Sequence, residues 1–592
     1  MDTKKLILAV VLSIIVISAY QYFFVKPVPM RTAQPSTNTA PGSTTPGKTG
    51  DEKKSTLDLG SILNDDVKTE EKSEIPAPTV EASITDTQEK TVSIETPDFT
   101  AVFTNKGAGL KSFVLKKYKD DQKNQLDLVS EKAEKTGTTA IYPFYFSPFG
   151  KESLFKILNG EKYLYQGETS IRIGNGEQKE ISFEYASQEK NISAKKTFIF
   201  TAGSFVVQMK FEVSQNGKKI EEVPVIFGPD LENNISLERT MLMKLKIGAY
   251  NGDGIKPLEF AKVKSQPTQD PNIEAARGEM GTGFYWAAYE TTYFAAILKT
   301  DMRSQLAWVL IKRKLDNNKA DLLSYMTVTN PKAVYLGPKD EEMLAKIESS
   351  FPDANKVIEY GWFGSIAKIM LKGILFIHRV IPNYGWAIIF FTLFLKIVLF
   401  PLTYSSSVSM AKMQTLQPKM KAIRKKYKNS RDPEQRRLMN METMALYKQE
   451  KVNPASGCLP MLLQLPILWG FFRLLQVSIT VRHEPWMLWI TDLSKKDPIY
   501  LLPILMGVTQ LIVQKMTPSG GDETQKKLMY IMPVLMIVLF ASFPSGLNLY
   551  WFFSNVLQIG QQKIINDKMF SKKKEEEKEK KSLKRKKGAI EK

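Results

Sequence analysis

Apolar residues in this 592-residue chain are gathered into long runs at its N-terminus and in its last third. A run of about 20 mostly apolar residues is long enough to cross a bilayer as a helix. The mean hydropathy of −0.22 hides this pattern, because a polar middle part offsets the runs. The clustering therefore predicts a multi-domain membrane protein with one part in the membrane and a large soluble part.

Six apolar segments are predicted to be transmembrane helices: an N-terminal anchor and five that form a helical core. They are residues 6–25, Trp386–Leu402, Leu459–Ile479, Ile499–Val513, Leu528–Phe543 and Leu547–Gly560. The fifth has 16 residues. A helix of this length spans about 24 Å against a hydrocarbon core of about 30 Å. The last segment is shorter and more polar, so the bilayer is expected to thin beside these two helices.

Composition divides the chain into parts with different structures. The region from Thr91 to Pro352 alternates short β-branched and aromatic runs with turn residues, which predicts an all-β sandwich domain. The segment before it is rich in Pro, Ser, Thr, Gly and charge, which is typical of a flexible linker. The predicted parts are an uncleaved anchor (1–26), a linker (27–86), a β domain (87–352), an interfacial amphipathic helix (353–382), a helical core (383–565) with a cytoplasmic helical hairpin (404–456), and a basic tail (566–592).

The segment between the β domain and the core is predicted to lie on the membrane surface. Its polar residues Ser365, Lys368, Lys372 and Arg379 are spaced by three, four and seven positions, so they share one face of a helix. A helix with this pattern suits the outer interface, with its lysines toward headgroups, better than a further span.

The formal net charge of +20 is concentrated beside the predicted spans. The loop from Thr403 to Gly457 carries twelve basic and four acidic residues, and the tail from Lys563 carries thirteen basic residues. Short loops rich in Lys and Arg stay in the cytoplasm. This pattern predicts that both termini are cytoplasmic and that the β domain lies on the other side of the membrane.

Lys396 lies inside the apolar run Trp386–Leu402, and no predicted span carries an Asp or Glu that would neutralise it. A lysine near the middle of a span costs about 2.5–3.5 kcal/mol, so such residues usually face a bundle interior or a wet cavity. The alternative is a lysine that snorkels to the interface. We predict a hydrophilic groove open to the cytoplasm, lined by Thr392, Lys396, Gln464, Gln510, Asn548, Ser554 and Asn555.

The residue content of this groove argues against several functions. It holds no acid or histidine, which disfavours transport by a proton relay. The two histidines, His378 and His483, lie outside the β domain, and no HExxH motif, P-loop or nucleophile–base pair is present. We therefore predict no catalytic residue, cofactor or metal site. An unpaired cation in a wet groove instead favours binding of a polar or acidic peptide.

Two basic regions leave alternatives open. The hairpin is predicted to be two helices, with Asp432 as the N-cap and Pro433 as the first residue of the second. Its methionines form either an adaptable surface for apolar segments or ordinary hairpin packing; they are Met410, Met413, Met420, Met439, Met441 and Met444. The tail either contacts lipid headgroups or ribosomal RNA, or serves only to retain the C-terminus in the cytoplasm.

Four stretches closely resemble the YidC family of membrane protein insertases, and the resemblance runs from about residue 361 to 562. They are PLTYSSSVSMAKMQTLQPKMKAIRKKY, MALYKQEKVNPASGCLPMLLQLPIL, DLSKKDPIYLLPILMGVTQ and FPSGLNLYWFFSN. The anchor and outer domain resemble the Gram-negative form, which implies the bacterial inner membrane and a periplasmic β-supersandwich similar to sugar mutarotases. In that family a five-helix core encloses a groove with an arginine, where Lys396 stands here. Lysine keeps the charge but lacks the planar bidentate fork.

The resemblance also implies an apolar surface along which an incoming span slides, at Leu468, Met506, Leu539 and Trp551. It implies a membrane protein insertase and chaperone rather than an enzyme, with nascent inner-membrane proteins as substrates and the Sec translocon, ribosomes and membrane lipids as partners. Two alternatives remain open: a folding scaffold beside the translocon without insertion activity, and a polysaccharide enzyme built on the outer domain.

Overall fold

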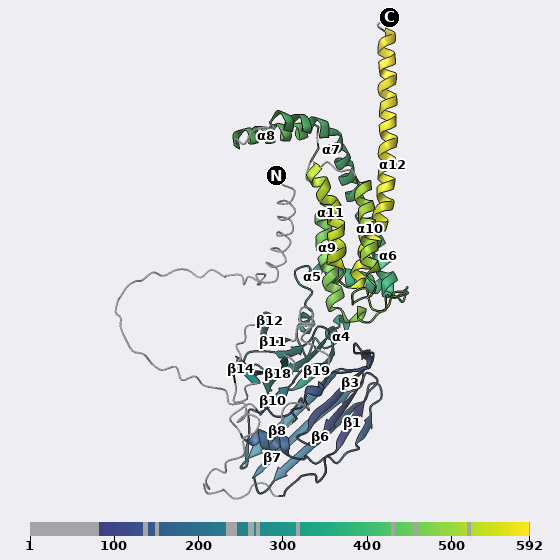
Figure 1. Ribbon diagram of the computed structural model, residues 1–592. Helices are drawn as coiled ribbons and strands as arrows, with labels where there is room; N and C mark the ends of the chain where they lie inside the picture. Colours follow the sequence, from purple (N-terminus) through teal and green to yellow (C-terminus); the bar gives the residue numbers. More distant parts are fainter. Residues whose placement is uncertain are drawn as a thin grey trace, which may run out of the picture. The chain divides into compact units, whose positions relative to one another are not determined.

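The chain forms two compact units (Figure 1). The computed structural model describes residues 82–133, 140–148, 153–232, 246–258, 266–267, 273–314, 320–427, 433–450, 452–453, 459–517 and 523–590. One unit comprises the described residues up to Glu359 and Gln476–Thr480, and the other comprises Tyr360–Leu475 and those from Val481 onward. The predicted anchor and almost all of the predicted linker lie outside the described residues.

The first unit is built almost entirely of strands, which agrees with the β-rich domain expected from its alternating sequence. Its two short α-helices are α3 (Ser153–Gly160) and α4 (Glu341–Lys346). Its strands are β1 (Thr91–Glu95), β2 (Phe99–Thr104), β3 (Gly109–Lys119), β4 (Gln125–Asp127), β5 (Ser170–Arg172), β6 (Gln178–Ser187), β7 (Ile192–Thr201), β8 (Val206–Gln215), β9 (Lys218–Lys219), β10 (Pro224–Phe227), β11 (Lys246–Tyr250), β12 (Ile255–Leu258), β13 (Gln266–Pro267), β14 (Ile273–Gly281), β15 (Trp286–Glu290), β16 (Phe294–Lys299), β17 (Leu306–Lys314), β18 (Ala320–Thr329) and β19 (Ala333–Pro338).

These strands form three sheets. One has the order β4-β3-β2-β1-β5, the second β10-β18-β17-β14-β13, and the third β12-β11-β15-β16-β19-β8-β7-β6 with β9 paired to β8. The paired strands are antiparallel, apart from β1 and β5, which run parallel. Neighbouring strands are mostly consecutive in the chain, as in hairpins and meanders, because short turns can join antiparallel strands.

Aromatic side chains fill much of the interior of this unit. Phe99 stacks on Phe113 at 4.4 Å, and Phe103 contacts Phe198 at 4.7 Å between ring centroids. All four rings are buried, and aromatic pairs of this kind add to the stabilisation that apolar burial provides. Lys196 on β7 is buried among them with no exposed surface.

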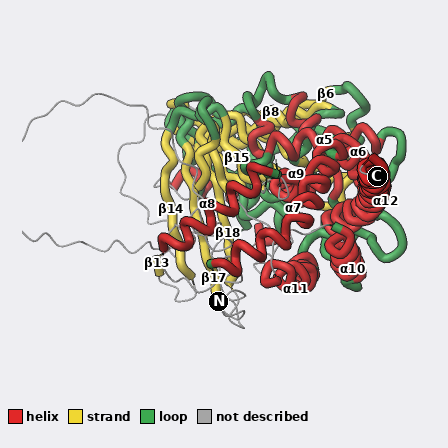
Figure 2. Tube along the Cα trace, turned by 90° about the horizontal axis from the view of Figure 1, so that it is seen from above, coloured by secondary structure: helices red, strands yellow, loops and turns green. Residues whose placement is uncertain are grey.

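The second unit is helical, which agrees with the expected helical core. Its helices are α5 (Gly364–His378), α6 (Tyr384–Val398), α7 (Phe400–Lys426), α8 (Pro433–Gln449), α9 (Leu459–Val477), α10 (Leu501–Met516), α11 (Glu523–Phe540) and α12 (Ser545–Ile590). Figure 2 shows the unit from above, with α12 beside α6 and α10 and with α8 lying across the view. Helix α12 has 46 residues and continues without a break from the last predicted span into the basic tail.

The predicted span Trp386–Leu402 is not one straight helix. Helix α6 ends at Val398, and α7 begins at Phe400 with a bend of 58° between the two. Pro401 lies at the start of α7, where its missing N–H is tolerated but its ring disfavours a continuous helix through the preceding residue. The bend brings the first turns of α7 alongside the core, although these residues were predicted to be the end of the span and the start of the cytoplasmic hairpin.

Measured by length and apolar content, no individual helix among the described residues passes as a membrane span, and only α6 and α7, taken together as a bent pair, do so.

Helix α5 has one buried and one exposed face. Ala367, Met370 and Ile374 are buried, whereas Lys372 is exposed. A Cβ atom on Gly373 would lie 2.4 Å from the ring of Phe391, so the close approach of α5 and α6 depends on this glycine. The exposed face carries Ser365 and Lys372 together with the apolar Ile369 and Phe376, so its composition is mixed.

The hairpin methionines divide into two groups. Met413, Leu416 and Val452 form a buried cluster between α7 and the end of α8, and the Tyr447 hydroxyl donates to Met420 Sδ at 3.3 Å. On the outer side of α8, the apolar side chains of Leu438, Met441 and Met444 are exposed. Part of the set therefore packs the hairpin and part forms an open surface. Helix α8 begins at Pro433, as predicted, whereas Asp432 lies outside the described residues.

Candidate functional site

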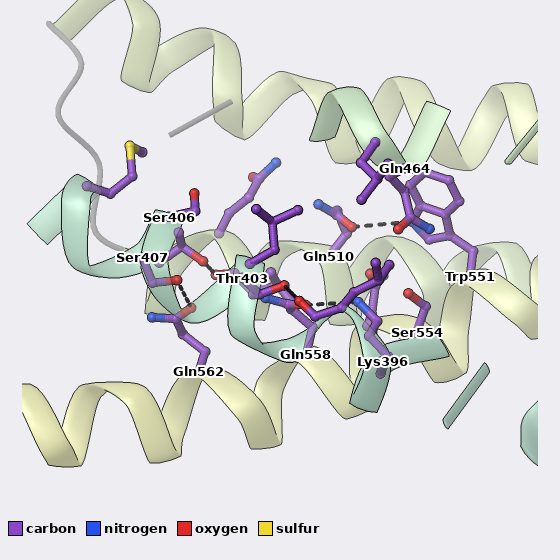
Figure 3. Close-up of a pocket in the computed structure, with 18 of the residues that line it drawn as sticks. Lys396, Thr403, Ser406, Ser407, Gln464, Gln510, Trp551, Ser554, Gln558 and Gln562 are labelled. Carbon is purple, nitrogen blue, oxygen red and sulfur yellow. Dashed lines mark hydrogen bonds between the residues drawn. The ribbon is translucent and has the colours of Figure 1, made fainter. Parts of the chain in front are cut away.

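A cavity of about 310 Å³ lies in the helical unit where α6 ends and α7 begins, and α9, α10 and α12 complete its wall (Figure 3). Most of its polar lining consists of hydroxyl and carboxamide groups. The polar lining residues are Lys396, Thr403, Ser406, Ser407, Gln464, Gln510, Gln514, Thr517, Trp551, Ser554, Asn555, Gln558 and Gln562. Among the described lining residues, Lys396 is the only one with an ionisable side chain.

Lys396 is on the last turn of α6 and extends toward α12. Its Nζ donates to Gln558 Oε1 at 2.9 Å, and its backbone carbonyl accepts from Gln561 Nε2 at 3.0 Å. Phe394 and Ile397, on either side of it, are exposed on the outside of the helix. Helical periodicity therefore turns the apolar neighbours outward and the half-buried ammonium group inward.

Carboxamide groups join α12 to its neighbours around the cavity. Trp551 Nε1 donates to Gln510 Oε1 at 3.4 Å, and Gln464 donates to the hydroxyl of Tyr550. Asn555 Nδ2 donates to the carbonyl of Met506 and to Thr509 Oγ1, at 3.1 and 3.2 Å. These bonds fix α9 and α10 against α12 and leave most of the cavity wall neutral.

The cavity continues beyond Lys396 toward the hairpin. Ser407 Oγ donates to Gln562 Oε1 at 3.4 Å, and Gln562 Nε2 donates to Asn566 Oδ1 at 2.9 Å. The side-chain oxygen of Gln514 is buried and accepts no hydrogen bond from the described residues. A buried acceptor without a donor is costly. This part of the cavity therefore suits a ligand that brings N–H or O–H groups.

The structure brings together most of the groove residues predicted from the sequence. Lys396, Gln464, Gln510, Ser554 and Asn555 all line the cavity, with Trp551 from the predicted apolar surface.

Two predicted groove residues do not line this cavity. The Thr392 hydroxyl is buried and donates to the carbonyl of Ile388 in its own helix at 2.7 Å. Asn548 is fully buried and donates to the carbonyl of Phe540 at 3.1 Å, where it joins the end of α11 to α12. Thr392 therefore bonds within its own helix, and Asn548 bonds to a neighbouring helix.

The other three residues of the predicted apolar surface differ in exposure. Leu468 on α9 is half-buried, and the side chain of Leu539 on α11 is 43% exposed. Met506 on α10 is fully buried, and its carbonyl accepts from Asn555. Met506 therefore packs α10 against α12, whereas Leu468 and Leu539 present apolar surface.

Several lining residues were not predicted, and most lie beyond the predicted ends of the spans, in the predicted hairpin or in connecting segments. Thr403, Ser406 and Ser407 follow the predicted end of the first core span, and Gln514 follows the end of another. Gln558 continues the helical face of Ser554 and Asn555, at spacings of four and three. Extending the helical period beyond the apolar run would have identified Gln514, four residues after Gln510, whereas the bend between α6 and α7 breaks the period before Thr403.

The cavity is suited to binding. Its described lining holds no carboxylate, imidazole or thiol to act as an acid, base or nucleophile. An ammonium group beside neutral donors and acceptors attracts a carboxylate, a peptide carbonyl or a polar side chain by hydrogen bonding and charge.

Both units match families of known proteins. Residues 376–573 match the family described as "60Kd inner membrane protein", and residues 91–372 match "YidC periplasmic domain". The membrane protein insertase YidC of Citrifermentans bemidjiense is 37% identical over 490 residues, which cover 81% of this chain and 85% of the relative. The membrane protein insertase YidC of Geobacter metallireducens is 33% identical over 577 residues, which cover 95% of this chain and 98% of the relative.

A solved structure also matches, described as an active YidC insertase with its first transmembrane domain resolved. It is 18% identical, covers 82% of this chain and 95% of its own, and has a TM-score of 0.32. The family assignment rests on the sequence relatives, which are more than 30% identical and are covered over 85% and 98% of their lengths. The chain belongs to the YidC family of membrane protein insertases.

Proposed function

We propose that this protein inserts inner-membrane proteins by receiving their polar or acidic tails in the cavity around Lys396. The supporting observation is the cavity itself, in which one ammonium group lies among hydroxyl and carboxamide groups. A polar tail that enters the cavity replaces its hydrogen bonds to water by hydrogen bonds to the cavity wall. The tail then crosses the hydrocarbon layer. Binding lowers the barrier, and no bond is made or broken.

The cavity opens toward the cytoplasm in this proposal. Its lining comes from the last turns of α6 and α10 and the first of α7, and these turns adjoin the basic segments after Leu402 and Val513. Basic segments remain on the cytoplasmic side. Six spans, cytoplasmic termini and a periplasmic β domain complete the proposed topology, and the short apolar stretch of α11 thins the bilayer beside it.

The remaining surfaces are assigned to partners. The apolar part of an incoming span contacts Leu468 and Leu539, and the exposed stripe of Leu438, Met441 and Met444 on α8 meets apolar segments before they reach the core. The basic C-terminal part of α12 contacts the ribosome or anionic lipid headgroups. The Sec translocon is a further proposed partner, as the resemblance to the YidC family implies.

Insertion by the purified protein tests the proposal. Liposomes that contain only this chain should insert a small two-span substrate, seen as a protease-protected fragment whose yield rises with the amount of insertase. Protein-free liposomes give the background. A folding scaffold without insertion activity would leave the yield at that background, and this result would reject the proposed function.

A further inference from the structure

We infer that Gln558 is a neutral placeholder for the substrate carboxylate at Lys396, and that it sets the preference of the cavity for acidic tails. The inference rests on the proposed function, because it assigns a role within the same cavity. Gln558 is a positioning residue: it acts through Lys396 and holds the ammonium group until an anion replaces its own oxygen.

The contacts of Lys396 carry this inference. Gln558 Oε1 accepts from Nζ at 2.9 Å, within ordinary hydrogen-bond distance for a charged donor. Both side chains line the cavity and meet at its wall, one from α6 and one from α12 (Figure 3). The resident partner of the ammonium group is thus a side chain at the edge of the space that a ligand would occupy.

The chemical type of this partner determines what the cavity selects. A carboxamide oxygen satisfies one N–H of the ammonium group but leaves the positive charge uncompensated. A carboxylate adds charge–charge attraction to the hydrogen bond with the same donor, so an acidic side chain of the substrate displaces the carboxamide. A neutral tail lacks this attraction to Lys396 and forms hydrogen bonds with the other polar groups of the cavity wall.

A second glutamine separates this role from helix packing. Gln561, one turn further along α12, donates to the backbone carbonyl of Lys396 at 3.0 Å. This bond joins α12 to the end of α6 whatever residue stands at position 558. Substitution of Gln558 therefore alters the partner of the ammonium group while the contact between the two helices remains.

Gln558→Glu tests the inference, because glutamate places a carboxylate of the same length where the carboxamide oxygen lies. In the liposome assay we expect at least a ~10-fold slower insertion of a two-span substrate with aspartates in its translocated tail. The same substrate with asparagines in their place should change by less than about twofold, which also shows that the variant is folded. Equal losses for both tails, or none for the acidic tail, would overturn the inference.

Two further variants complete the test. Gln562→Glu adds the same charge to the same wall one turn away, where the carboxamide contacts Ser407, and should lower the acidic-to-neutral ratio by a smaller factor than Gln558→Glu, because it does not give the ammonium group of Lys396 a carboxylate partner. Gln558→Leu removes the acceptor without adding charge and should leave insertion of the acidic tail within about threefold of normal. A change in ratio with Gln562→Glu as large as that with Gln558→Glu would contradict a specific role for Gln558.

The outcomes distinguish this inference from the proposed function. If replacing Lys396 by alanine leaves insertion of the acidic tail unchanged, the charge mechanism itself fails. If that replacement slows insertion but Gln558→Glu leaves the ratio of the two substrates unchanged, only the placeholder role of Gln558 is rejected.

Discussion

Replacing Lys396 by glutamate is expected to slow insertion of an acidic-tailed substrate by about 100-fold or more. Two unit charges about 4 Å apart interact by about 4 kcal/mol at an effective dielectric constant of 20, and each 1.4 kcal/mol is a factor of ten. The substitution turns this attraction into repulsion, and water in the cavity weakens both. Initial rates of fragment protection in liposomes measure the effect.

The other substitutions at this position separate charge from shape. Lys396→Arg should insert the same substrate at nearly the normal rate, and Lys396→Ala about tenfold more slowly, because only the alanine removes the attraction. Lys412→Glu, an identical charge reversal at an exposed position on α7, should have little effect. Equal rates for lysine, arginine, alanine and glutamate at position 396 would contradict the charge mechanism.

Lys196→Met should lower the free energy of unfolding of the β-rich unit by about 2–4 kcal/mol. Lys196 Nζ donates to the carbonyls of Gly107 and Phe144, each at 2.7 Å, and lies 3.9 Å from the centre of the Phe146 ring. Both acceptor residues have positive φ angles, 63° and 70°, which Phe144 adopts at a cost. A buried carbonyl left without a donor costs about 1–3 kcal/mol. Proteolysis of the full-length protein in a denaturant series measures the change.

Lys195→Met is the matched control for this prediction. Lys195 is the adjacent residue on β7, and its ion pair with Glu184, at 2.7 Å, is solvent-exposed. Exposed pairs contribute about 1 kcal/mol or less, so this variant should remain close to the original stability. If Lys196→Met were as stable as Lys195→Met, the buried lysine would have no structural role.

Stability should also depend on pH through Lys196. Burial lowers the pKa of this lysine well below its ordinary value, so in the pH range between the two pKa values the unfolded chain binds more protons than the folded one. The free energy of unfolding then rises with pH, by up to about 1.4 kcal/mol per unit. Burial raises the pKa of Tyr145 and Tyr163, the ionisable rings nearby, so they do not titrate below pH 9. Lys196→Met should lose this rise at pH values below the ordinary pKa of lysine.

Local sequence patterns predicted the two kinds of structure well, because each has its own period. Alternation of apolar residues identified the β-rich unit, and the apolar runs identified most core helices. The bend between α6 and α7 was missed, although Pro401 is in the run that was read as one span. A proline can kink a helix or begin a new one, and packing decides between these outcomes.

The cavity was predicted in part for a similar reason. A polar residue in an apolar run indicates an inward-facing side chain, which identified Lys396, Gln464 and Gln510. Sequence alone does not show whether such a residue faces a cavity or a neighbouring helix, so Thr392 and Asn548 were included although both bond to backbone carbonyls. The pairing of Lys396 with Gln558 joins residues 162 positions apart and depends on how α6 packs against α12.

Access of anions to Lys396 from the cytoplasm is the central claim, and thiol labelling tests it most directly. Cys458 is the only cysteine, so Cys458→Ser followed by Gln510→Cys places a single thiol in the cavity wall. In inside-out membrane vesicles, an anionic methanethiosulfonate should label this thiol faster than a cationic reagent of similar size, and Lys396→Ala should abolish the preference. No labelling from that face, or equal rates for both reagents with Lys396 present, would contradict the account.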